Sequence, residues 1–276
     1  ETGIAEEYGL GLNEIALIIA SHSGEKEHIS TIRAMMEKTG INEDMLKCGV
    51  HDPVNRDAAK QLSLEGKSPT RLHCNCSGKH IGLIAASKLK NVTVEGYQQE
   101  SHEIQKDIRK IISEFCNVEI EEMKTGVDGC GLPIYAVPLK NIALSYANLC
   151  DVEFKNGKYS KSQNYVLSAM TMYPEMVAGK GRLDTEIMRT FGDRMISKIG
   201  AEGVYCAGII GKSIGIAIKI DDGSSRAVGP VIIDTLIQMK IIDESEAKPL
   251  INFWKPPVMN HNKKEAGKIR PVFKLK

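Results

Sequence analysis

Hydrophobic positions recur with helical spacing through most of the first two hundred residues. In the segment 25–38, the apolar side chains fall on one face of a helix, and Gly40 follows the end of the pattern. The same reasoning predicts a helix that begins near Cys76. Further helices are predicted at residues 53–64, 97–115, 139–149, 160–172, 184–196 and 227–239.

The pattern changes near residue 200. Residues 204–210 and 214–220 are rich in β-branched and apolar residues, and a polar turn follows at 222–225, which is typical of strands. Residues 134–137 and 268–275 predict two more extended segments. Because helices are concentrated in the middle of the chain and strands near its end, we expect an α+β fold rather than alternating βαβ units.

Composition excludes several classes of partner. The chain has 276 residues, and its 36 basic and 35 acidic residues leave no excess of positive charge to attract nucleic acid or anionic lipid. Aromatic residues make up only 5%, which also disfavours stacking on bases. No apolar run is long enough to span a bilayer. We therefore expect neither nucleic-acid nor membrane partners.

The cysteines indicate a reducing environment. There are seven, an odd number, and they are irregularly spaced. A secreted disulfide-rich domain would be shorter and denser in cysteine. Reduced thiols in a cytoplasmic protein are the better interpretation.

Two segments about fifty residues apart carry the most reactive side chains. Residues 73–80 gather thiols, a hydroxyl, an amine and imidazoles, and residues 126–133 form a glycine-rich loop with an acid and a thiol. Cys76 or Cys74 could bind zinc together with Cys130, but two thiols one residue apart rarely both reach one ion. On these residues alone, buried cysteines that act as small apolar fillers are favoured, because no C-x-x-C pair is present.

Two serine-containing segments allow both functional and structural interpretations. Ser77, Gly78 and Lys79 at a helix start would suit an anionic ligand, or they are a simple N-cap followed by a solvated lysine. The complete P-loop pattern is absent, so nucleotide binding is disfavoured. Ser21, after an apolar run, could be a nucleophile. The alternative, favoured on the residues alone, is that Ser23 and its neighbours cap the following helix.

Two later segments are equally open. Lys198 and Glu202 lie in a glycine-containing turn before a strand, where a desolvated lysine could act as a base or could form a surface ion pair. The segment 179–184 could be a lid over a substrate, or an ordinary connection that ends with Asp184 as a helix N-cap.

Taken in order, these motifs resemble the asparaginase II family, which has a serine β-lactamase and glutaminase-like fold. The resemblance runs from about residue 5 to the C-terminus, and the ordered set is specific where no single motif is. The motifs are A-S-H-S-G-E at 20–25, C-G-V-H at 48–51, C-S-G-K-H at 76–80, V-D-G-C-G at 127–131, V-A-G at 177–179 with Arg182, K-I-G-A-E-G-V at 198–204 and G-I-A-I-K-I at 215–220.

The resemblance implies hydrolysis of the side-chain amide of L-asparagine to aspartate and ammonia by serine–lysine acyl transfer. It implies a zinc cofactor, a homodimer and a single domain over residues 1–276, with a helical part at about 22–196 and sheet-associated parts at about 1–21 and 197–276. The helical part is expected to pack against a mostly antiparallel sheet. The implied residues are Ser21 and Lys198 for catalysis, Cys76, Lys79 and Cys130 for zinc, and His80, Asp128, Arg182 and Glu202 for the substrate. By its charge alone, Asp128 is the candidate to face the α-ammonium group of the substrate.

One part of the family pattern is missing. Members carry a further S-x-x-K helix after two N-terminal strands, and nothing before Ser21 fits that motif. We therefore expect the chain to be either a fragment or a shortened relative with impaired or lost activity. A non-catalytic zinc- and amino-acid-binding relative is the alternative function. A β-lactam-recognising acyl enzyme is a third, against which the absence of S-D-N and K-T-G motifs counts.

Overall fold

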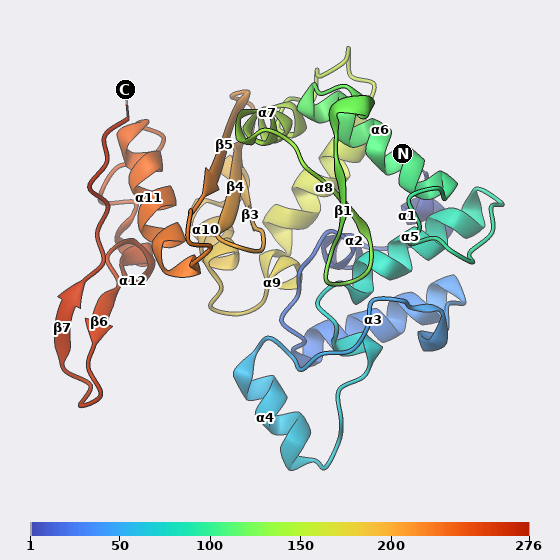
Figure 1. The fold of residues 1–276 in the computed structure, drawn as a ribbon, viewed down its shortest axis with the longest axis horizontal. Coiled ribbons are helices and arrows are strands. Elements are labelled where there is room, and N and C mark those ends of the chain that lie inside the picture. The colour runs from blue at the N-terminus through green and yellow to red at the C-terminus, as the bar shows by residue number, and fades with distance from the viewer. Residues whose placement is uncertain (1, 276) are drawn as a thin grey trace.

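The computed structural model describes residues 2–275 and has an α+β architecture. Helices dominate the first 190 residues, and a small antiparallel sheet follows them (Figure 1). The helices are α1 (Ile4–Glu7), α2 (Leu12–Ile18), α3 (Lys26–Thr39), α4 (Arg56–Leu64), α5 (Ser77–Leu89), α6 (Glu103–Cys116), α7 (Leu139–Leu149), α8 (Ser160–Met172), α9 (Pro174–Val177), α10 (Leu183–Phe191), α11 (Val228–Gln238) and α12 (Ile251–Trp254).

The main sheet has the order β3–β4–β5, and both pairings are antiparallel. In Figure 1, α11 and α12 lie on one side of this sheet and α7 and α8 on the other. Two short hairpins stand apart from it. The strands are β1 (Thr125–Val127), β2 (Pro133–Tyr135), β3 (Met195–Ile199), β4 (Val204–Ile209), β5 (Ile214–Lys219), β6 (Pro257–Met259) and β7 (Glu265–Lys268).

The register of the sheet decides which side chains face the helical body. Lys198 pairs with Cys206, and Ile196 pairs with Gly208, so these alternate positions share one face. Glycine is needed on that face, because a Cβ at Gly208 or Gly215 would collide with the backbone of α7. The opposite face carries the apolar core formed with α10 and α11.

A second core lies within the helical part, where α2, α3 and α5 pack together. This core includes four buried cysteines, Cys48, Cys74, Cys76 and Cys130, which therefore sit at the border between apolar packing and the loops. A third cluster joins α2 to α8 and to the sheet. Residues 4–18, expected beside the sheet, form α1 and α2.

Most predicted helices are confirmed to within a few residues. The prediction for 97–115 began too early, because Tyr97 is buried against His80 and the helix begins only after His102, whose ring accepts the amide of Ile104. Extended structure near 134–137 is confirmed as β2.

Of two predictions in the second half of the chain, one was wrong at its C-terminal end and the other almost throughout. The helix predicted at 184–196 ends at Phe191, Gly192 turns the chain with φ 56°, and Met195 begins β3. The apolar spacing after Phe191 fits the period of a helix and that of a strand equally well, and pairing with β4 stabilises the strand. The predicted strand at 268–275 is also wrong: β7 ends at Lys268, and the chain beyond it is bonded to Gln238 of α11.

Within residues 2–275, no helix has both the length and the apolar character needed to cross a membrane.

Candidate active site and metal centre

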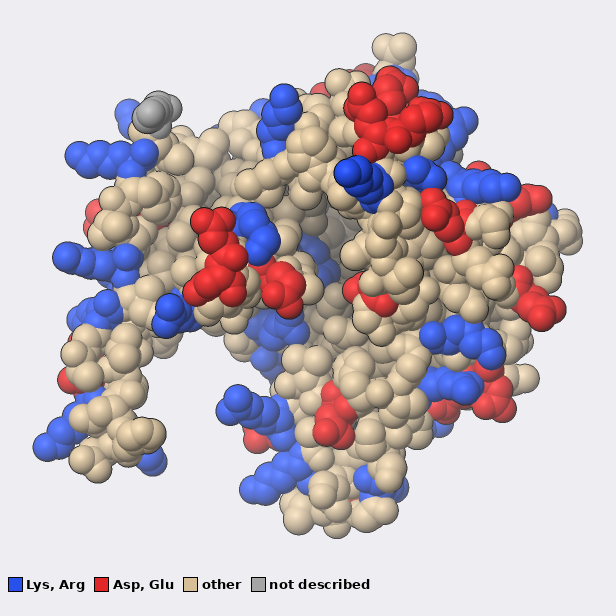
Figure 2. Space-filling view, in the orientation of Figure 1, with Lys and Arg blue, Asp and Glu red and all other residues tan. Residues whose placement is uncertain are grey.

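A cavity of about 520 Å³ collects the loops that carry the sequence motifs. The face seen in Figure 2 is hollowed between the sheet and the β1–β2 hairpin. A larger cavity of about 620 Å³ lies between α3 and α4 but contains none of the predicted site residues. The smaller cavity is lined by Ser21, Cys48, His51, Cys74, Asn75, Cys76, Lys79, Asp128, Gly129, Cys130, Arg182, Ile199, Gly200 and Ala201.

The first turn of α5 places two of the predicted metal ligands. Cys76 is the N-cap residue and Lys79 lies in the first turn, so both project from the same end of the helix. Gly78, between them, has no room for a side chain, because a Cβ there would collide with the carbonyl oxygen of Leu17 at the end of α2. The close approach of the two helices therefore fixes the position of this turn.

The tight loop between β1 and β2 places the third ligand, Cys130. Asp128 and Leu132 close the loop through a 2.8 Å backbone hydrogen bond, and the Asp128 carboxylate accepts the amide of Gly129 at 2.8 Å. Gly131 supplies a left-handed conformation with φ 82°. The aspartate and the thiol, two residues apart, thus face the same space.

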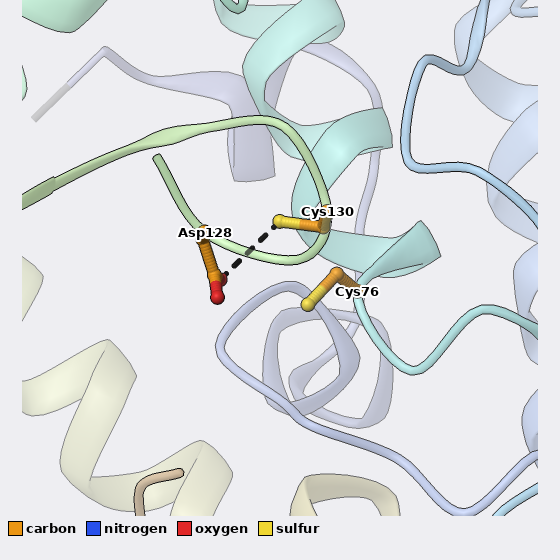
Figure 3. A group of neighbouring side chains, drawn as sticks. All are labelled: Cys76, Asp128 and Cys130. Carbon is orange, nitrogen blue, oxygen red and sulfur yellow. Dashed lines mark hydrogen bonds between the residues drawn. The ribbon is translucent and has the colours of Figure 1, made fainter. Parts of the chain in front are cut away.

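The two segments meet in a compact group of ligand-type side chains (Figure 3). The ligand atoms of Cys76, Asp128 and Cys130 all lie within 4.8 Å of one another. The Cys130 thiol is 3.4 Å from the Asp128 carboxylate, and Lys79 Nζ is 3.8 Å from the same carboxylate. The thiols are buried, whereas the Lys79 and Asp128 side chains remain 36% and 38% exposed. The group is therefore reachable from the cavity.

Without a metal, the two thiols and the Lys79 amine hold their protons. The hydrogen bond with Cys76, together with burial, raises the pKa of Cys130 to about 12. The bond to Cys130 lowers the pKa of Cys76, but its contact with Cys74 and its burial outweigh that effect and raise it. Burial opposes the charged form of Lys79, yet the thiols and Asp128 raise its pKa overall. A bound cation would displace these protons.

The donor set fits Zn²⁺. Two thiolates with an amine or a carboxylate match the sulfur, nitrogen and oxygen ligands that zinc takes in tetrahedral sites. Asp128, expected to bind substrate, lies close enough to be a ligand as well. Sequence reasoning missed this second possibility, although its place two residues before Cys130 was a usable signal.

The predicted nucleophile lies on the loop that follows α2. Ser21 lines the cavity, and its amide donates to the carbonyl of Val177 at 3.0 Å. The favoured interpretation, that Ser23 caps the helix α3, was wrong. The N-cap is Glu25, and the Ser23 hydroxyl donates to the carbonyl of Ala178 at 2.7 Å. Both contacts bind the S-H-S-G-E loop to the V-A-G loop.

Lys198 stands at the edge of the same space. It lies on the face of β3 that looks toward α7 and α8, and the three residues after it line the cavity. Burial, with the charge of Arg182, lowers the pKa of Lys198, although Asp184 opposes this shift. Lys198 Nζ donates to the carbonyl of Ile199 at 2.8 Å, and no hydrogen bond within residues 2–275 joins it to Ser21.

Asp184 takes a different role from the N-cap expected of it. Arg182 is the N-cap of α10, and the fully buried Asp184 carboxylate accepts the amide of Ile199 at 2.5 Å. Burial raises the pKa of Asp184. Arg182 lines the cavity, with one guanidinium nitrogen 3.3 Å from Ser23 Oγ and another 3.9 Å from Asp184.

Two predicted substrate residues do not line the cavity. His80 is fully buried, with its Nδ1 2.6 Å from the Tyr97 hydroxyl. Its ring also contacts Cys130. Glu202 is exposed at the β3–β4 turn with φ 55°. His51, for which the sequence offered no partner, lines the cavity and accepts the amide of Asn75 at 3.0 Å.

The sequence profile of L-asparaginase II matches residues 1–271. The chain belongs to the L-asparaginase II family. A search of curated proteins gave no match. Membership supports an amidohydrolase-type enzyme that acts on a small molecule.

Proposed function

We propose that this member of the L-asparaginase II family hydrolyses L-asparagine to aspartate and ammonia, with Ser21 as the nucleophile and Lys198 as the base. The observation that supports the proposal is the convergence of Ser21, Arg182 and the Lys79–Asp128 pair on one cavity, with Lys198 beside it. A volume of about 520 Å³ is ample for an amino acid.

The charged groups of the cavity match the two ends of an amino acid. The Asp128 carboxylate would face the α-ammonium group, and the Arg182 guanidinium would bind the α-carboxylate. Arginine carries five N–H donors in a fixed fork, so its contacts with Ser23 and Asp184 leave donors for a ligand. The side-chain amide would then extend toward Ser21.

Acyl transfer requires a neutral lysine. Burial favours the neutral amine of Lys198, which can take the proton of the Ser21 hydroxyl as its oxygen attacks the amide carbon. Lys198 returns this proton to the amide nitrogen, the C–N bond breaks and ammonia leaves, and water then hydrolyses the ester. Zinc, held by Cys76 and Cys130 with Lys79 or Asp128, would supply positive charge to this pocket and join its two loops.

The test is ammonia release from L-asparagine by the full chain and by Ser21→Ala. Loss of the nucleophile should lower the rate at least about 1,000-fold, and Lys198→Met at least about 100-fold. Ser63→Ala, exposed on α4, is the matched serine control and should keep the full rate. Equal turnover by the wild-type chain and Ser21→Ala would remove Ser21 from the mechanism.

One observation favours the alternative of a non-catalytic zinc- and amino-acid-binding relative. Lys198 Nζ is bonded to a backbone carbonyl rather than to Ser21. Calorimetric binding of L-asparagine by the wild-type chain without any ammonia release would support this alternative over the enzyme. The homodimer remains a prediction, which sedimentation velocity tests.

A further inference from the structure

Two thiols of the cavity wall have no part in the proposed chemistry. Cys48 and Cys74 both line the cavity and lie side by side: the Cys74 thiol donates to the Cys48 carbonyl at 3.3 Å, and the two thiols also contact each other. Their exposed fractions are only 3% and 1%, so a small solute must reach them through the cavity. The pair is separated by 26 residues of chain.

We propose that Cys48 and Cys74 form a disulfide when a hydroperoxide enters the cavity, so that the chain carries an oxidation site beside, and separate from, the Cys76–Cys130 pair. This proposal is independent of asparagine hydrolysis. It concerns only which thiols meet when one of them is oxidised.

The local backbone suits closure of the bond. Cys48 lies in a loop just before Gly49, which has φ 77°, and Cys74 ends the short 3₁₀ helix Arg71–His73. Neither cysteine is inside an α-helix or a strand, so small changes in backbone torsion can bring the two sulfur atoms to bonding distance. The thiol contact is already present, so the reorganisation is local.

The neighbouring thiols are less suited to this reaction. Cys76 and Cys130 are the sulfur atoms most suited to hold zinc, and coordination withholds a thiolate from an oxidant. Cys150 is 1% exposed, packs in the cluster between α2, α8 and the sheet, and does not line the cavity. Cys74 also contacts Cys76. With Cys76 and Cys130 holding zinc, Cys48 and Cys74 are the adjacent sulfurs that the cavity leaves free for a hydroperoxide.

The reaction balances with a hydroperoxide as the oxidant. One thiolate attacks a peroxide oxygen, the O–O bond breaks, and the leaving oxygen takes a proton to become water or an alcohol. The second thiol then attacks the sulfenic sulfur, an S–S bond forms, the S–O bond breaks, and water leaves. Two thiols lose two electrons, and the peroxide gains them.

The experiment treats the isolated full chain with hydrogen peroxide, blocks remaining thiols, and maps tryptic peptides by mass spectrometry. Peptides 48–56 and 72–79 should appear cross-linked, lighter than their sum by two hydrogens, and the link should vanish with a dithiol reductant. Because 72–79 also contains Cys76, the variant Cys74→Ser decides the assignment, and it should lose the cross-link, as should Cys48→Ser. Cys150→Ala is the matched control and should keep it.

Three results would overturn the proposal. The first is a cross-link that survives in Cys74→Ser, which would assign Cys76 as the partner. The second is a dominant link to peptide 125–140, which contains Cys130. The third is oxidation of Cys48 or Cys74 to sulfinic acid with no cross-link at any peroxide concentration. Circular dichroism of each variant establishes that a lost cross-link is not a lost fold.

Discussion

The histidines of the helical part and the side chains of the cavity differ in how their polar atoms are used. In His22, His28 and His73, Nδ1 accepts a backbone amide two or three residues away in sequence, and the same is true of His102. His51 accepts the amide of Asn75, 24 residues away, through Nε2. A ring nitrogen that accepts a hydrogen bond cannot also carry a proton, so these contacts commit one nitrogen of each ring to an acceptor role.

The cavity groups, in contrast, mainly contact one another. The thiols of Cys76 and Cys130, the amine of Lys79 and the carboxylate of Asp128 make most of their contacts within the group, so an ion or a substrate can replace those contacts.

Ser77 shows why this difference matters. It belongs to the C-S-G-K motif, and its hydroxyl lies 2.9 Å from His22 Nε2, which looks like a serine–base pair. Yet His22 Nδ1 accepts the amide of Gly24, so Nε2 carries the proton and donates to Ser77, which donates to the carbonyl of Leu72. The ring cannot accept the serine proton. Motif membership and proximity alone would have proposed Ser77 as a nucleophile with His22 as its base.

The largest expected effect comes from removing a thiol of the cavity group. Cys130→Ser should lower zinc affinity by more than the roughly 100-fold that loss of an outer-shell partner costs, because a serine hydroxyl is a poor zinc ligand. Zinc content and competition with a chelator measure it. Cys116→Ser, at the end of α6, is the control and should bind zinc normally. A comparison of Lys79→Met with Asp128→Asn then shows which of the two side chains is the third zinc ligand. Unchanged zinc affinity in Cys130→Ser would refute the site.

The next largest expected effect is a dependence of stability on pH, which arises from the buried histidine His28. Burial lowers the pKa of His28 from 6.5 to about 4, so the unfolded chain binds this proton first. Stability is therefore complete above about pH 6.5 and falls as the pH drops toward 4. The loss from His28 should be about 2–3 kcal/mol between about pH 7 and pH 4.5. Urea unfolding at several pH values measures it, and His28→Gln should flatten the curve by that amount. An identical pH curve in that variant would contradict the assignment.

The smallest effect concerns Ser77. Ser77→Ala removes the acceptor of the buried His22 N–H, which should cost about 2 kcal/mol of unfolding free energy. Zinc stoichiometry should stay unchanged, because the hydroxyl faces His22 and Leu72. A stable Ser77→Ala variant that loses zinc would show that the Ser77 hydroxyl takes part in holding the metal.

The helical part was the easier half of the fold to predict. Helices with a clear apolar face, such as α7 and α8, begin and end where the sequence pattern places them. The errors fall where local and long-range forces compete. Residues 192–196 were assigned to a helix because their apolar spacing fits both periods, and only pairing with β4 resolves it. The terminal segment after β7 was misjudged because its polar contacts are with α11.

The candidate site could be predicted in part. The six predicted site residues that line the cavity came from ordered motifs, since such motifs name side chains that must be near one another. The sequence could not show which of these side chains contact one another. Nothing in the order of residues says that Asp184 is buried against the amide of Ile199, or that Cys48 contacts Cys74. These contacts depend on how separate loops are brought together.

The attachment of the Ser21 loop also affects when the site can form during synthesis. The loop is tied to the carbonyls of Val177 and Ala178, roughly 155 residues farther along the chain. Closing so long a loop is slow compared with forming the helices between, and it cannot begin before the later segment has left the ribosome. The nascent chain can therefore fold most of its helical body while its serine is still unplaced.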